Sequence, residues 1–196
     1  MRHITIVAIA SAAVLATIAP VASATTAPPA PTKKLTKKSL QPLVQLSAER
    51  LLVSDEVAAA KWGTGKPIDD PAREQQVIDE AATQARQLGT DPAEVVRFFQ
   101  DQIAASKDVQ RGLFRLWDAE PSKAPTSRPD LSQIRIKLNR IDSELVQAIA
   151  DTGTVRSSSA CESRLTAAYM RTGHALRLDA LHAFALGRAL PHVCEA

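Results

Sequence analysis

Three helix-start signals, each followed by apolar residues at helical spacing, limit the folds that are open to this chain. Asp70 and Asp91 each precede a proline that suits the first position of a helix, and Asp130 precedes a third apolar stripe. In each segment the apolar residues recur every three or four positions, which is the spacing of one buried helix face. Aromatic residues make up only 4% of the chain, and runs rich in valine, isoleucine and threonine are few, so the composition disfavours sheet. We therefore predict an all-α fold, a single-domain bundle of about five to six helices.

The bounds of these helices follow from the start signals and the stripes. We expect helices over residues 39–62, 70–89, 91–117 and 130–149, and one or two more between 160 and 192. Residues 54–56 form a second start signal inside the first helix, so a kink near Val53 is an alternative to one continuous helix. The proline-rich segment 118–130 predicts a linker, and the polar, glycine-containing segment 151–159 predicts a break after the fourth helix.

The N-terminus has the features of a signal peptide over residues 1–24. A short polar start is followed by the apolar run Ile4–Ile18, and Ala22-Ser23-Ala24 matches the small-residue pattern of a cleavage site. An uncleaved membrane anchor is the alternative, although the apolar run is short for a membrane-spanning helix. We expect an exported protein, periplasmic or secreted, with no membrane association after cleavage.

The mature chain is predicted to begin with a flexible extension and to continue as one domain. Residues 25–38 are rich in proline and then in lysine, with little to bury, and residues 39–196 are long enough for one hydrophobic core. The formal net charge of +3 is too small to indicate a nucleic acid as partner.

Two cysteines, Cys161 and Cys194, remain in the expected exported chain. An even number of cysteines in an oxidising compartment predicts a disulfide, with two free thiols as the alternative. Such a bond would stabilise the fold by about 4 kcal/mol in the loop-entropy description. No neighbouring motif indicates redox chemistry, so we interpret the bond as structural.

A candidate anion site begins with Arg50 and Lys61. They lie eleven residues apart, about three helical turns, and therefore share one face of the first predicted helix. Antiparallel packing of the helices could bring further polar residues into the same pocket: Asp70, Arg73, Glu74, Ser106, Gln110 and Arg135. Such a pocket holds cations and hydrogen-bond donors without an evident nucleophile, which suits a small dicarboxylate. Ordinary surface salt bridges are the alternative interpretation.

Ser106 and Gln110 lie on the apolar stripe of the third predicted helix. Buried polar groups destabilise a fold unless they find hydrogen-bond partners. We therefore expect the two side chains to bond each other or a water, or to face a polar site.

Other classes of site find no support in the sequence. The histidines His174, His182 and His192 lack metal-ligand spacing, and neither an HExxH nor a GxSxG motif is present, so we predict no metal site and no nucleophile elbow. The segment Gly63–Lys66 resembles a phosphate loop only superficially, because it follows a helix and Pro67 stands where a serine or threonine is needed.

Several motifs with consistent separations carry a family resemblance over residues 40–150. They are AERL at 48–51, AAAKW at 58–62, PIDDPARE at 67–74, DPAEVVRFFQDQIAASKDVQ at 91–110 and LSQIR at 131–135. With these motifs the chain resembles the all-helical chorismate mutases, and the paired cysteines match the exported subclass of that family.

The resemblance implies that the chain isomerises chorismate to prephenate by a unimolecular Claisen rearrangement without a cofactor. Arg50 and Arg135 would bind the two carboxylates of the substrate in its compact, reactive conformer. Lys61 and Gln110 would donate to the ether oxygen, where negative charge builds as the bond breaks. Such a reaction needs conformational restriction and preorganised charge.

The resemblance also implies roles for the rest of the pocket. Asp70, Arg73, Glu74 and Ser106 would line it, with Glu74 as partner of the ring hydroxyl. We expect each protomer to build its own pocket within a homodimer. The alternatives are a catalytically silent helical protein that binds a small carboxylate, and an interaction protein whose charges are solvated; an exposed Lys61 would favour the latter.

Overall fold

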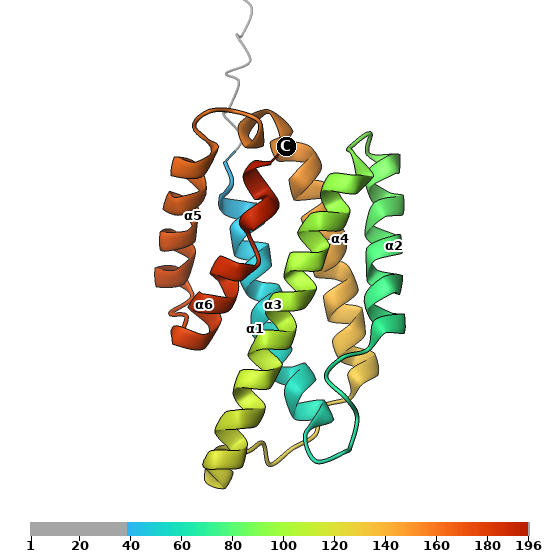
Figure 1. Ribbon diagram of the computed structural model, residues 1–196, viewed down its shortest axis with the longest axis vertical. Coiled ribbons are helices and arrows are strands. Elements are labelled where there is room, and N and C mark those ends of the chain that lie inside the picture. The colour runs from blue at the N-terminus through green and yellow to red at the C-terminus, as the bar shows by residue number, and fades with distance from the viewer. Residues whose placement is uncertain (1–38, 196) are drawn as a thin grey trace, which may run out of the picture. The chain divides into compact units, whose positions relative to one another are not determined.

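The three acidic start residues cap three helices in the computed structural model, which describes residues 39–195 (Figure 1). Asp70 accepts a hydrogen bond from the backbone N–H of Arg73 at 3.2 Å. Asp91 and Asp130 accept from backbone N–H groups two residues further on, at 2.9 Å and 2.8 Å. Each side chain thereby satisfies one of the donors that a helix leaves unpaired at its N-terminus.

The described residues form six α-helices and two short 3-10 helices, without a strand. In chain order these are α1 (Gln41–Lys61), α2 (Pro71–Gln87), α3 (Pro92–Ala119), η1 (Pro121–Lys123), α4 (Leu131–Arg156), α5 (Cys161–Ala175), α6 (Ala180–Arg188) and η2 (Pro191–Cys194). The prediction of an all-α bundle is confirmed. The expected signal peptide and N-terminal extension lie outside the described residues, and none of the described helices could span a membrane.

The helices α1 to α4 each contribute residues to the candidate site. The helix α1 packs against α3 and α4, and α2 packs against the same two helices from the other side of the site. The pair α5 and α6 packs on α1, and α6 also packs on α3. The core between these helices is built from fully buried apolar side chains that include Leu43, Val44, Leu51, Phe99 and Leu145.

Two expectations about helix continuity are settled by long-range contacts. The break expected over 151–159 is wrong for residues 151–156, because α4 continues to Arg156. The guanidinium of Arg156 forms a buried ion pair with Glu94 of α3, which holds the last turns of α4 in helical form. The helix α1 is continuous through Val53, and Ser54 bonds the side chain of Ser106 at 2.8 Å instead of starting a new helix.

The predicted disulfide is confirmed between Cys161 and Cys194, with a Cα–Cα distance of 5.7 Å. It joins the start of α5 to η2 at the end of the chain. Because Cys161 is buried and α5 has few contacts with η2, the covalent bond secures a part of the fold that packing alone holds weakly.

Candidate active site

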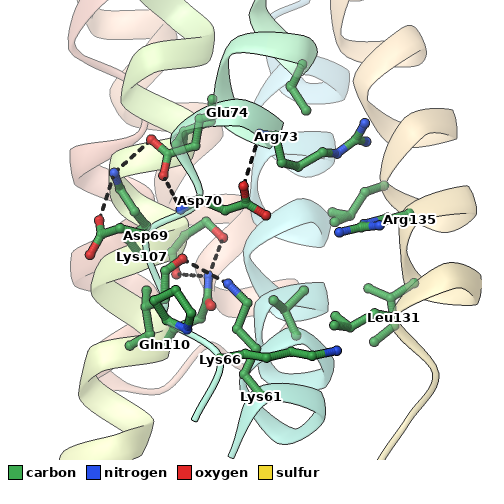
Figure 2. Close-up of a pocket in the computed structure, with 18 of the residues that line it drawn as sticks. Lys61, Lys66, Asp69, Asp70, Arg73, Glu74, Lys107, Gln110, Leu131 and Arg135 are labelled. Carbon is green, nitrogen blue, oxygen red and sulfur yellow. Dashed lines mark hydrogen bonds and ion pairs between the residues drawn. The ribbon is translucent and has the colours of Figure 1, made fainter. Parts of the chain in front are cut away.

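A pocket of about 560 Å³ lies between α1, α2, α3 and α4, and the loop 62–70 borders it. All eight residues that the sequence predicted for the site line this one pocket: Arg50, Lys61, Asp70, Arg73, Glu74, Ser106, Gln110 and Arg135. Figure 2 labels Lys61, Asp70, Arg73, Glu74, Gln110 and Arg135 among them. They come from all four helices and from the residue that caps α2. The fold therefore brings these residues together in one pocket, as the sequence predicts.

Arg50 is the most deeply placed cation of the pocket, with an exposed fraction of 5%. Its Nε donates to Oδ1 of Asp142 on α4 at 2.7 Å, and its Nη1 donates to the carbonyl oxygen of Gln102 on α3 at 3.3 Å. A buried charge that is paired in this way keeps a fixed orientation. The remaining N–H groups of the guanidinium are available to an anion in the pocket.

Lys61 ends α1 and is half buried at the pocket wall. Its Nζ donates to the carbonyl oxygen of Ile68 at 2.8 Å, which ties the loop to the helix. Burial lowers the pKa of Lys61 from its ordinary value, while the carboxylates of Asp70 and Glu74 act in the opposite direction. An ammonium group has more than one N–H, so Lys61 can donate to a ligand as well as to the loop. Because Lys61 is partly buried and hydrogen-bonded to the loop, it does not fit the alternative of an interaction protein whose charges are solvated.

The start of α2 brings Asp70, Arg73 and Glu74 to the rim of the pocket. Besides capping the helix, Asp70 donates its backbone N–H to Oε1 of Glu74 at 3.2 Å. The guanidinium of Arg73 donates to Oδ1 of Asn139 on α4 at 2.6 Å. The carboxylate of Glu74 is thus positioned by the start of α2, and the guanidinium of Arg73 is positioned by α4.

Ser106 and Gln110 of α3 satisfy the expectation that they bond each other. Nε2 of Gln110 donates to the carbonyl oxygen of Ser106 at 3.3 Å and to its hydroxyl at 3.4 Å. Gln110 is only 4% exposed, and among the described residues its Oε1 has no hydrogen-bond partner. The carboxamide is therefore buried at the pocket wall, with its nitrogen bonded to Ser106 and its acceptor oxygen unpaired.

Arg135 is exposed on α4 and extends toward the cavity from the side opposite α2 and α3 (Figure 2). Its positive charge contributes to lowering the pKa of Lys61, after burial as the main cause. Arg50 and Arg135 thus stand on different walls of the pocket, as two separate carboxylates would require.

Four charged lining residues were missed in the sequence: Lys66, Asp69, Lys107 and Asp142. Asp142 follows Arg135 by two helical turns, so its spacing could have placed it on the same face. Lys66 belongs to the segment Gly63–Lys66, whose only sequence signal is a superficial likeness to a phosphate loop. Lys107 and Asp69 carried no signal, because their contact joins α3 to a loop that is distant in sequence.

The charges of the lining favour an anionic ligand. Six cationic and four anionic side chains border the pocket, which leaves an excess of two positive charges. Residues 39–195 contain no group of three or more histidine, cysteine, aspartate or glutamate side chains that could hold a metal ion. The arrangement offers fixed cations and N–H donors around a space for a small molecule.

Comparison with known proteins agrees with this geometry. Residues 41–111 match the family described as chorismate mutase type II. Over 156 residues the chain is 37% identical to the secreted chorismate mutase of Mycolicibacterium smegmatis, which covers 80% of this chain and 86% of the relative. It is 34% identical to the secreted chorismate mutase of Mycobacterium tuberculosis, over 80% of this chain and 79% of the relative. The crystal structure of a chorismate mutase from Burkholderia thailandensis superposes with a TM-score of 0.75 at 38% identity, over 79% of this chain and 98% of the other.

Proposed function

This chain belongs to the exported, all-helical chorismate mutases, and we propose that the pocket lined by α1, α2, α3 and α4 is where it isomerises chorismate to prephenate. The observation that carries the proposal is the match between pocket and substrate in charge. Chorismate bears two carboxylates, and the charged side chains of the lining have an excess of two positive charges. A neutral or cationic ligand would leave this excess unpaired.

Arg50 and Arg135 bind the two carboxylates of the substrate. Arg50 is oriented by Asp142 at 2.7 Å, so its remaining N–H groups can form a bidentate pair with a carboxylate without a large loss of side-chain freedom. Arg135 approaches from a different wall of the pocket (Figure 2). Two anchors on different walls hold the substrate in a compact conformer, in which the carbon atoms to be joined lie close together.

Lys61 and Gln110 stabilise the charge that develops during the reaction. As the carbon–oxygen bond of the ether breaks, negative charge accumulates on the ether oxygen, and both side chains can donate to it. Lys61 is half buried and held at 2.8 Å by Ile68, and Gln110 is buried, so little reorganisation is needed when the charge appears. Donors in such a partly buried site act more strongly than they would in water.

Asp70, Arg73, Glu74 and Ser106 complete the binding site. The carboxylate of Glu74 accepts the hydrogen bond of the ring hydroxyl, while Asp70 and Arg73 close the rim and Ser106 orients the carboxamide of Gln110. The rearrangement breaks one carbon–oxygen bond and forms one carbon–carbon bond within a single molecule. It therefore transfers no electron or group to a partner, and we propose that the protein works without a cofactor.

All of the proposed site residues belong to one chain, so each protomer can build a complete pocket. We propose a homodimer in which the two pockets are independent. The mature helical domain is proposed to span residues 39–196, after a signal peptide over 1–24 and an extension over 25–38.

The test is the loss of chorismate absorbance with the mature protein, in the wild type and in Lys61→Ala. Removal of one donor to a developing oxyanion costs about 2.7–4 kcal/mol, so turnover should fall about 100- to 1,000-fold. Lys123→Ala is the matched control, because Lys123 pairs with Glu120 at 2.9 Å in η1, outside the pocket. Absence of turnover in a folded wild type would instead favour a silent carboxylate-binding protein.

A further inference from the structure

Lys107 of α3 lines the proposed substrate pocket and forms ion pairs with two of its carboxylates. Its Nζ donates to Oε2 of Glu74 at 2.9 Å and lies 3.2 Å from Oδ1 of Asp69 (Figure 2). Asp69 is held in turn by the guanidinium of Arg111 at 2.8 Å. Burial lowers the pKa of Lys107, but the two carboxylates outweigh it and leave that pKa above its ordinary value. The ammonium group is therefore charged at neutral pH.

The contact with Lys107 completes the orientation of the Glu74 carboxylate. Oε1 of Glu74 accepts from the backbone N–H of Asp70 at 3.2 Å, and Oε2 accepts from Lys107. A carboxylate oxygen can accept more than one hydrogen bond, so both oxygens keep capacity for a ligand. Without Lys107 only one of the two oxygens would be restrained, and the carboxylate could turn toward solvent.

Lys107 also offsets an unfavourable charge. Glu74 and Asp69 would both repel an anionic substrate, and Lys107 pairs with each of them. Its removal would lower the positive excess of the pocket lining from two charges to one.

We propose that Lys107 is a positioning residue that fixes the Glu74 carboxylate for the ring hydroxyl of chorismate and so determines selectivity for the hydroxylated ring. The inference rests on the proposed function of the pocket. Lys107 acts through Glu74 and touches no reacting atom, so its contribution concerns substrate binding in the ground state and in the transition state alike. Loss of such uniform binding raises KM and leaves kcat nearly unchanged.

The experiment compares two substrates in the wild type, Lys107→Met and Lys107→Arg at 0.15 M salt, where long-range charge effects are screened. One substrate is chorismate, and the other is an analogue in which hydrogen replaces the ring hydroxyl. For chorismate, Lys107→Met should raise KM about 10-fold, the usual effect of losing a hydrogen bond to a charged group. Lys107→Arg keeps the charge and the donor and should stay within about 3-fold of the wild type. The analogue lacks the hydroxyl contact but still meets the lost positive charge, so for it Lys107→Met should raise KM by clearly less than for chorismate, and Lys107→Arg should match the wild type.

The matched control is Lys137→Met, which removes a lysine from the exposed ion pair of Lys137 with Glu56 at 2.6 Å. It carries the same charge change outside the pocket lining and should leave both KM values unchanged. Thermal unfolding shows whether each variant is folded. If Lys107→Met does not fold, Lys107→Gln provides the same comparison.

The outcomes separate this inference from the function on which it rests. A wild type that does not convert chorismate refutes the proposed function. A wild type that converts chorismate, combined with an equal effect of Lys107→Met on both substrates or with no effect on either, overturns the role of Lys107 alone.

Discussion

The change Gln110→Glu turns the pH dependence of the reaction into a readout of one hydrogen bond. The Gln110 amide can donate at any pH, whereas a glutamate side chain donates only when it is protonated. In the structure Nε2 of Gln110 lies 3.3 Å from the carbonyl oxygen of Ser106, so an ionised carboxylate there would face that oxygen without a proton between them. Gln110 is only 4% exposed, and burial further disfavours the charged form.

The expected sign follows from these two effects. Both raise the pKa of the introduced carboxyl group, and the nearby ammonium of Lys61 opposes them only in part. Gln110→Glu should therefore be most active at acidic pH and lose activity as the pH rises through the raised pKa. Loss of the donor costs about 2.7–4 kcal/mol, so the deprotonated variant should be about 100- to 1,000-fold slower than the wild type. The wild type should keep a nearly flat profile across neutral pH.

The assay measures kcat/KM for chorismate between about pH 4.5 and 8.5. It compares the wild type with Gln110→Glu and with the control Gln147→Glu. Gln147 is exposed on α4 and outside the pocket, so its change adds the same charge without touching the site. A flat profile for Gln110→Glu at wild-type rates would refute the role of Gln110 as a donor. A steep loss for the wild type between pH 5 and 8 would count against it as well.

Two further predictions concern stability. His182 of α6 is 4% exposed and lies 2.9 Å from Asp55 and 2.8 Å from Asp179, contacts that raise its pKa from 6.5 to about 9. The raised pKa of His182 adds at most about 3 kcal/mol to the free energy of unfolding, because the two carboxylates are partly exposed. This stabilisation is complete below pH 6.5 and is lost as the pH rises through about 9. The free energy of unfolding measured in urea should therefore fall over that pH range. The change His182→Asn should flatten this fall, and an unaltered slope would contradict the assignment. Arg156→Met should lower the free energy of unfolding in urea by about 3–5 kcal/mol, because it leaves Glu94 buried without its cation. Adding Glu94→Leu should recover most of that loss. If the losses from the two changes simply add, the buried pair is refuted.

Local signals made much of the fold predictable. The caps at Asp70, Asp91 and Asp130 act over two or three residues, so the sequence contains both partners of each hydrogen bond within one turn. The shared face of Arg50 and Lys61 is equally local, since helical periodicity alone places it. The cysteine pair could be inferred from number and compartment because only one pairing was open to it.

Contacts between distant segments account for what could not be predicted. The last turns of α4 are held by the ion pair of Arg156 with Glu94 of α3, whereas Gly153 in the same segment locally favours a break. In the same way, the hydroxyl of Ser54, which the sequence presents as a helix start, bonds Ser106 of α3 and the carbonyl oxygen of Arg50 in α1.

The sequence by itself determined the kinds of residue at the site, the helices that carry them and the face on which each lies. The tertiary structure decided which of them are held and by what. Asp142 orients Arg50, and Lys107 restrains Glu74, in each case across a gap between helices that only packing closes. A charged side chain gains a fixed position from a partner that lies within hydrogen-bond distance, and for these two pairs that distance depends on how the helices pack.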